Sequence, residues 1–194
     1  YKGNTLLWLR QPGSRYSRKY MSSSMNMLAT PHGAWDAWAW NVDNGLDATI
    51  QSNDESWPKV SIVTPSFNQG QFLEETIRSV LMQGYPNLEY IIIDGGSTDN
   101  SVEIIRRYER WISSWVSEPD QGQADAINKG FSRSTGAIIG WLNSDDLLCP
   151  GSIKRVVETF LSYSDVDMIY GDVSYGAALD NIEREILGSQ LDFG

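Results

Sequence analysis

The sequence has little cysteine, little histidine and few basic side chains. Cys149 is its single cysteine, so no disulfide can form within the chain, which fits a reducing compartment. His32 is its single histidine and has no metal-ligating neighbours, so we interpret it as structural or incidental. Lysine and arginine total 15 against 25 aspartates and glutamates, a formal net charge of −10. Nucleic-acid backbones and anionic membrane surfaces attract basic patches, so we expect neither as a partner.

Long apolar runs and two phosphate-binding signatures are also absent from the sequence. No apolar stretch approaches the roughly 20 residues of a transmembrane helix, and no signal peptide is visible. We therefore predict a cytoplasmic location, with the full-length protein able to lie peripherally at the inner face of the membrane. The P-loop pattern and the Gly-x-Gly-x-x-Gly fingerprint do not occur, which argues against P-loop nucleoside triphosphatases and dinucleotide-dependent dehydrogenases.

Residues 1–57 differ in character from the rest of the chain. The stretch AWDAWAW, residues 34–40, holds three tryptophans in seven residues, and its surroundings show little periodicity. Two interpretations stay open: an aromatic platform for sugar binding, or an extension (or the tail of a preceding segment) that packs its tryptophans on the main domain. The chain begins at Tyr1 and ends without a clear terminus signal. We expect a piece of a longer protein, with the second domain, residues 58–194, incomplete at its C-terminus.

From residue 58 onward, short apolar runs alternate with amphipathic segments. The apolar runs predict strands at residues 59–64, 88–94, 114–118, 137–142 and 167–173. Apolar residues at helical spacing predict helices over 71–83, 101–111, 124–131 and 153–161. This alternation is typical of βαβ units, so we predict an α/β fold with a mainly parallel sheet and helices on both faces. Capping-box spacing predicts two helix starts, at Asn100 with Glu103 and at Asp120 with Gln123.

Four short polar segments follow the predicted strands, and each is rich in glycine, asparagine or aspartate: residues 64–70, 94–101, 118–125 and 143–146. Ligands of open α/β sheets bind outside the carboxyl ends of the strands. We therefore expect these segments to converge on one crevice.

Three acids in these segments suggest chemistry. Asp145 and Asp146 directly follow an apolar strand. A Mg²⁺ or Mn²⁺ ion bound there would let an acidic crevice accept a diphosphate and would stabilise that diphosphate as a leaving group. The alternative is that the pair caps the next helix or lies solvated in a turn. Asp94 also has two alternatives, since it can accept a hydrogen bond from a base N–H or from the backbone of its own turn.

The chain resembles the family 2 glycosyltransferases of the GT-A fold over roughly residues 59–173. The resemblance rests on three stretches in the family's order: "SIVTPSFNQGQFLEETIRSVLMQGYPNLEYIIIDGGSTDNSVEII", "SEPDQGQADAINKGF" and "GAIIGWLNSDDLLCPGSI". It implies a Rossmann-like GT-A domain and Mn²⁺ or Mg²⁺ as cofactor. It also implies a nucleoside-diphosphate sugar donor, with a UDP-sugar favoured, a saccharide or glycolipid acceptor, and a role in polysaccharide biosynthesis.

The resemblance also implies roles for individual residues. Asn143 stands where many members have aspartate, and Gly95 replaces a common second aspartate. Asp145 and Asp146 match the metal ligands. The implied nucleotide-sugar contacts are Thr64, Pro65, Ser66 and Asn68 in the first loop, Asp94 at the base, Asp125 and Lys129 with Asn128 nearby at a helix start, and Asn143, Ser144 and Asp145 in the metal motif.

The implied reaction inverts the anomeric centre. A base takes the proton of the acceptor hydroxyl, the oxygen attacks C1, and the metal-bound nucleoside diphosphate departs. We expect the base beyond residue 194; Asp172 and Asp192 lie downstream of the metal motif, and neither is assigned the role. Two alternatives stay open: a catalytically silent nucleotide-sugar-binding module, and a nucleotidyltransferase-like enzyme. The absence of a basic residue in segment 64–70 argues against the latter.

Overall fold

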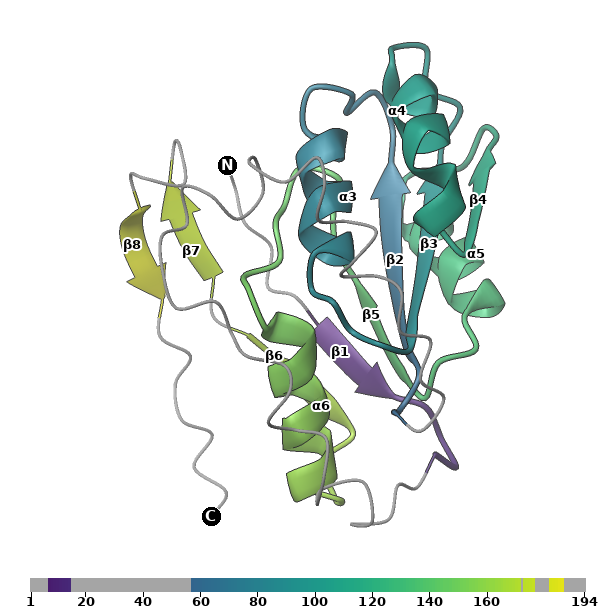
Figure 1. The fold of residues 1–194 in the computed structure, drawn as a ribbon. Helices are drawn as coiled ribbons and strands as arrows, with labels where there is room; N and C mark the ends of the chain where they lie inside the picture. The colour runs from purple at the N-terminus through teal and green to yellow at the C-terminus, as the bar shows by residue number, and fades with distance from the viewer. Residues whose placement is uncertain (1–6, 15–56, 172, 177–181, 187–194) are drawn as a thin grey trace.

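The computed structural model describes residues 7–14, 57–171, 173–176 and 182–186 (Figure 1). These residues form a six-stranded sheet of order β4-β3-β2-β5-β1-β6 and a two-stranded antiparallel sheet of β7 and β8. The strands are β1 (Leu7–Arg10), β2 (Val60–Ser66), β3 (Leu88–Asp94), β4 (Ser114–Ser117), β5 (Ile138–Trp141), β6 (Met168–Tyr170), β7 (Val173–Gly176) and β8 (Ile182–Ile186).

The strands β2 to β5 form the parallel half of the large sheet. Strand β2 pairs with β3 on one side and with β5 on the other, and β4 pairs with β3. The chain therefore moves outward from β2 to β4 and then returns to β5 across β2, which makes the β2–β5 boundary the topological switch point. The intervening helices are α3 (Leu73–Leu81), α4 (Ser101–Tyr108), the 3₁₀ helix η3 (Glu109–Trp111), α5 (Gln123–Arg133) and α6 (Ser152–Ser162).

Helices cover both faces of the sheet, as the sequence predicts, and this confirms the α/β class. A large apolar core joins one face of the sheet to α3, α4 and α6, and Figure 1 shows α4 in front of β3 and α3 beside β2. A smaller core on the other face joins Val63, Ile91 and Ile93 to Ala126 of α5. Gly130 allows α5 to lie close to β2, because a Cβ there would be 2.2 Å from Val63 Cγ1.

Strand β1 lies in the large sheet although the sequence analysis did not predict it. It pairs antiparallel with β5 and with β6, so part of the segment 1–57 belongs to this sheet. Trp8 in its centre is 1% exposed and packs over Gly140, where a Cβ would lie 2.6 Å from Trp8 Cε3. The tryptophans of segment 34–40 and His32 lie outside the described residues.

The remaining predicted elements are present with shifted bounds. The first parallel strand continues through Pro65 to Ser66 instead of ending before the proline. The segment predicted as one strand at 167–173 holds β6 and the first residue of β7. In the described part of the chain, no helix has both the length and the hydropathy that a membrane span needs.

The helix start predicted at Asn100 is confirmed, but without the capping hydrogen bond, and the start predicted at Asp120 is wrong. Asn100 is the N-cap of α4 but makes no capping hydrogen bond, and Gly122, not Asp120, is the N-cap of α5. Instead, Asp99 Oδ1 accepts a 2.9 Å hydrogen bond from the Ser101 amide, and Asp120 Oδ1 accepts one of 2.8 Å from the Gly122 amide. Local aspartate turns therefore hold the chain at the two helix starts.

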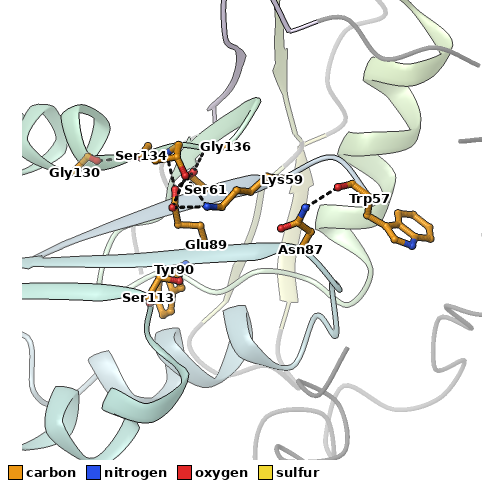
Figure 2. Close-up of polar contacts among 11 residues, drawn as sticks. Trp57, Lys59, Ser61, Asn87, Glu89, Tyr90, Ser113, Gly130, Ser134 and Gly136 are labelled. Atoms are coloured by element: carbon orange, nitrogen blue, oxygen red, sulfur yellow. Dashed lines mark hydrogen bonds and ion pairs between the residues drawn. The ribbon is translucent and has the colours of Figure 1, made fainter. Parts of the chain in front are cut away.

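A buried carboxylate ties together the amino ends of β2, β3 and β5 (Figure 2). Glu89 is 9% exposed and accepts hydrogen bonds from Ser61 Oγ at 2.5 Å and from the amide and hydroxyl of Thr135 at 2.7 Å each. Lys59 Nζ lies 2.9 Å from it, and Ser61 Oγ accepts a bond from the Gly136 amide. Burial alone would raise the pKa of Glu89, but these hydrogen bonds outweigh it and lower the pKa to about 2.

Candidate functional site

The switch point lies where two strand pairings end at different places. The pairing of β2 with β5 ends at Val63 and Trp141, whereas the pairing of β2 with β3 continues to Ser66 and Asp94. The polar segments that follow β2 and β5 therefore start at this boundary. Such a boundary is where ligands of open α/β sheets bind.

Hydrogen bonds join the four polar segments to one another. Asn68 of the first segment bonds to Ser97 of the second, and Ser117, just before the third, donates to Asp94 of the second. Gln123 of the third segment donates to Asn143 of the fourth. The structure thus confirms that all four segments lie at one edge of the sheet.

Asn68 fixes the first polar segment against the second. Its backbone adopts a left-handed conformation with φ of 52°, which asparagine tolerates better than most residues. Its amide donates to Ser97 Oγ at 2.8 Å, and its Oδ1 accepts from the Thr98 amide at 2.8 Å. Phe67 directly precedes it and is 57% exposed. The sequence analysis did not single out Phe67, although an aromatic side chain within a polar segment is a signal that could have found it.

The other predicted residues of the first segment are buried. Thr64 is fully buried, and its hydroxyl shares a 3.0 Å hydrogen bond with Tyr90 Oη inside the core, so its side chain does not line the edge. Pro65 is also buried. Ser66 is 4% exposed, and within the described residues its Oγ has no hydrogen-bond partner. Because an unsatisfied buried hydroxyl costs about 1–3 kcal/mol, this atom is a candidate for contact with a ligand.

Asp94 is engaged by its own turn and by the neighbouring strand. It is fully buried, and its carboxylate accepts hydrogen bonds from the Gly96 amide at 3.2 Å, the Ser97 amide at 2.9 Å, the Ser97 hydroxyl, and Ser117 Oγ at 2.6 Å. A carboxylate has about four acceptor positions, and these four donors use them. The geometry supports the own-turn alternative, and contact of Asp94 with a base stays a prediction.

Gly95 leaves space for the neighbouring side chain of Asp120. A Cβ at this position would lie 2.7 Å from Asp120 Oδ2. An aspartate side chain at residue 95, which is common in the resembling family, would therefore meet the carboxylate of Asp120. The glycine avoids both the steric contact and the repulsion between two acids.

Lys129 and two acids form a charged group at the start of α5. Lys129 Nζ lies 3.2 Å from Asp125 Oδ2 and 3.4 Å from Glu118 Oε1, and Asp125 Oδ2 also accepts a 3.1 Å bond from the Gln121 amide. That bond, together with Lys129, lowers the pKa of Asp125. Burial alone would lower the pKa of Lys129, but the two carboxylates raise it. An incoming anion must therefore compete with two carboxylates for this ammonium; the side chain of Asn128 nearby is exposed.

The fourth segment is anchored to α3 and α5. Asn143 and Ser144 are 7% and 4% exposed, whereas Asp145 and Asp146 are partly exposed. Thr76 Oγ1 of α3 lies 2.9 Å from the carbonyl oxygens of both Ser144 and Asp146. The loop that carries the two acids is thus held by a buried hydroxyl of α3.

The side chain of Asn143 links α5 to the acid pair. Its Oδ1 accepts a 2.5 Å hydrogen bond from Gln123 Nε2, and its Nδ2 donates to Asp146 Oδ2 at 2.9 Å. The sequence analysis did not include Gln123 among the site residues, because no sequence pattern relates it to Asn143.

The donor set fits a metal ion that arrives with a phosphate ligand. Within the described ranges, no cluster of three or more histidine, cysteine, aspartate or glutamate side chains could hold a metal by itself. Asp145 and Asp146 supply two carboxylates on one loop. Mg²⁺ and Mn²⁺ sites of nucleotide-binding proteins use one or two carboxylates and complete their shell with phosphate oxygens and water.

Comparison with known proteins identifies the family. The model of "Glycosyl transferase family 2" matches residues 61–186. An uncharacterized glycosyltransferase of Nostoc sp. is 35% identical over 111 residues, which cover 56% of this chain and 34% of that protein. A Bacillus subtilis relative, whose name provisionally places it in teichuronic acid biosynthesis, is 36% identical over 110 residues, covering 55% and 44% of the two chains.

A solved structure supports the fold. The mannosyltransferase PcManGT of Pyrobaculum calidifontis, in complex with GDP-Man and Mn²⁺, aligns with a TM-score of 0.52 and 25% identity over 64% of this chain and 37% of that one. The chain matches less than half the length of the Nostoc and Bacillus relatives. The family model, the curated relatives and the mostly parallel sheet agree: the chain belongs to glycosyl transferase family 2 and has the α/β, Rossmann-like GT-A fold.

Proposed function

We propose that this chain forms the donor-binding part of an inverting, metal-assisted glycosyltransferase, which moves a sugar from a nucleoside-diphosphate sugar to an acceptor hydroxyl. The observation that carries the proposal is the meeting of four polar segments and two adjacent acids at the switch point of the sheet. Family membership supports transferase chemistry at this site.

The nucleotide would bind beside the end of β2. Phe67 offers an exposed aromatic face on which a base can stack, and base–aromatic stacking is worth about 1–3 kcal/mol. Ser66 Oγ offers a buried hydroxyl that a ligand can satisfy. We propose a UDP-sugar as donor. Because the archaeal mannosyltransferase was solved with GDP-Man, the choice of base needs a direct test.

Asp145 and Asp146 would hold the metal, as Mn²⁺ or Mg²⁺. When bound, the ion neutralises the diphosphate and stabilises it as a leaving group. Manganese in the complex of the archaeal mannosyltransferase supports a divalent ion for this fold. The contribution of this chain is to place the two carboxylates, which the hydrogen bonds of Thr76 and Asn143 achieve.

The acceptor and the general base complete the proposed reaction. We place the base beyond residue 194; Asp172 and Asp192 lie outside the described residues. A base that removes the acceptor proton contributes typically 10²–10⁴-fold in rate. The acceptor is proposed to be a saccharide or glycolipid in polysaccharide assembly, which the name of the Bacillus relative supports. The proposed location is cytoplasmic, peripheral at the inner membrane face in the full-length protein.

Calorimetric titration tests the donor site. UDP, GDP and CDP are titrated into the chain with Mn²⁺, with Mg²⁺ and with neither ion. The proposal expects binding of one base that depends on the metal, and equal inertness toward all three would contradict it. Hydrolysis or transfer from the matching nucleotide-sugar, assayed with saccharide acceptors, then separates a transferase from a silent binding module.

A further inference from the structure

We propose that Gln123 and Asn143 form an amide relay that positions the Asp146 carboxylate for metal binding. The inference rests on the proposed function, because it assigns a task to residues beside the proposed metal ligands. Gln123 and Asn143 act as positioning residues. The relay runs from the first residue of α5, through the end of β5, to the loop that carries the acids.

The acid at one end sets the direction of every hydrogen bond in the relay. An ionised carboxylate only accepts hydrogen bonds, so Asn143 must turn its Nδ2 toward Asp146. Its Oδ1 must then face Gln123, which has to donate with Nε2. The nitrogen and oxygen of an amide side chain are assigned from its hydrogen bonds. Here the Asp146 carboxylate fixes that assignment for both Asn143 and Gln123.

Burial and a backbone hydrogen bond hold the middle of the relay, whereas Gln123 at its first end is exposed. Asn143 is 7% exposed, and its carbonyl accepts a 3.1 Å bond from the Asp146 amide, so the residue holds both the backbone and the side chain of Asp146. Without Gln123, the Asn143 Oδ1 would lose a partner and its amide could rotate. A hydrogen bond that orients a metal ligand typically accounts for 10–100-fold in metal affinity.

The relay also explains the asparagine at residue 143. An aspartate there would face the Asp146 carboxylate at the 2.9 Å separation that the amide now occupies, and two acids so close cannot both stay ionised without a cation between them. The amide replaces that repulsion by a hydrogen bond. The loop therefore keeps a fixed geometry before a metal arrives.

The test compares Gln123→Ala, Gln123→Glu and the control Gln121→Ala in the full chain. Mn²⁺ binding in the presence of UDP is measured from the electron paramagnetic resonance signal of free Mn²⁺, and with GDP or CDP if UDP does not bind. Gln123 acts on Asp146 only through Asn143, so Gln123→Ala should weaken Mn²⁺ binding about 10-fold, the lower end of the effect expected for a residue that bonds a metal ligand directly. Gln121→Ala, whose exposed side chain is outside the relay, should leave Mn²⁺ binding unchanged.

Gln123→Glu separates the relay from simple electrostatics. Glutamate can only accept, so it would draw Asn143 Nδ2 away from Asp146 and turn Oδ1 toward that carboxylate. The relay expects Mn²⁺ binding at least as weak as in Gln123→Ala. An added negative charge alone would make Gln123→Glu bind Mn²⁺ more tightly than Gln123→Ala does, and that result overturns the relay. Equal Mn²⁺ affinity of Gln123→Ala and the parent chain also overturns it.

A readout without metal distinguishes failure of the relay from failure of the proposed function. The side-chain amide signal of Asn143 in ¹⁵N NMR should shift and exchange faster with water in Gln123→Ala, and should stay in place in Gln121→Ala. If the parent chain binds no Mn²⁺ with UDP, GDP or CDP while this signal responds, the amide contact exists but the proposed function and the metal role of the relay both fall. An unchanged signal overturns the relay itself.

Discussion

Ser61 and Glu89 lie directly opposite each other on the parallel strands β2 and β3, and the serine hydroxyl donates a 2.5 Å hydrogen bond to the glutamate carboxylate. This pair lies at the amino edge of the sheet, whereas the acids Asp145 and Asp146 follow the carboxyl end of β5. The edge that this pair stabilises is therefore opposite to the edge that holds the proposed ligand site. Variants at the two edges should separate stability from ligand binding.

Glu89→Gln should destabilise the fold without changing the affinity for nucleotide. The amide that replaces the carboxylate brings two donor hydrogens toward the Ser61 hydroxyl and the Thr135 amide, which are donors already. The expected loss is about 2–3 kcal/mol in the free energy of unfolding, measured by urea denaturation. Glu103→Gln, at an exposed position of α4, is the matched control and should change stability little.

The same carboxylate sets a pH dependence. The pKa of Glu89 is lowered from its ordinary value of 4.5 to about 2 in the folded chain. Its contribution is therefore complete above pH 4.5 and is lost as the pH falls from 4.5 toward 2. Urea midpoints measured between pH 7 and pH 3 should fall more steeply for the parent chain than for Glu89→Gln. Parallel pH profiles would contradict this assignment.

Asp145→Ala should abolish the metal dependence of nucleotide binding. The side chain is partly exposed, so its removal should leave the melting temperature nearly unchanged. Calorimetry with Mn²⁺ and the preferred nucleoside diphosphate should show a loss of at least tenfold in affinity, because an acidic edge without a cation repels a diphosphate. Asp165→Ala removes an exposed acid from the turn after α6 and should bind like the parent chain. Equal loss in both variants would point to net charge instead of a site.

The sequence predicts the parallel half of the fold well because its signals are local. The strands β2, β3 and β5 are buried on both faces and read as apolar runs, and α3, α4 and α6 show one apolar side. Strand β1 is missed because four residues give too short a pattern. Its partner β5 is also distant along the chain, so only the folded sheet shows why Trp8 is buried.

The sequence predicts where the candidate site lies, but it does not predict the side-chain contacts within the site. Strands that end at one edge bring their following segments together, which the sequence order alone indicates. The direction of each side chain cannot be predicted in the same way, because a strand buried on both faces shows no alternation of polar and apolar residues. The sequence therefore did not indicate that the Thr64 side chain points into the core. The contact of Gln123 with Asn143 depends on how α5 lies across the sheet, which no local pattern encodes.

Phe67→Ala should weaken nucleotide binding without loss of stability. The ring is 57% exposed, so little buried apolar area disappears with it. If a base stacks on it, the loss is about 1–3 kcal/mol, or roughly 5- to 150-fold in the dissociation constant, and Phe67→Tyr should retain most of the affinity. Tyr163→Ala, which removes a ring that is 59% exposed at the end of α6, is the control. Unchanged affinity in Phe67→Ala would remove the ring from the donor site.

Asp94→Asn distinguishes a positioning role from direct contact with the base. The carboxylate holds Ser97, and Ser97 in turn accepts the amide of Asn68, the residue after Phe67. An asparagine keeps one acceptor but turns an N–H₂ group toward hydroxyl or amide donors, so the loop that presents Phe67 should loosen. UDP, GDP and CDP should then lose affinity by similar factors, and amide hydrogen exchange of residues 67–70 should accelerate. If the carboxylate contacts the base directly, the loss of affinity should be confined to the preferred nucleotide, with amide exchange unchanged, and that result would contradict the positioning role.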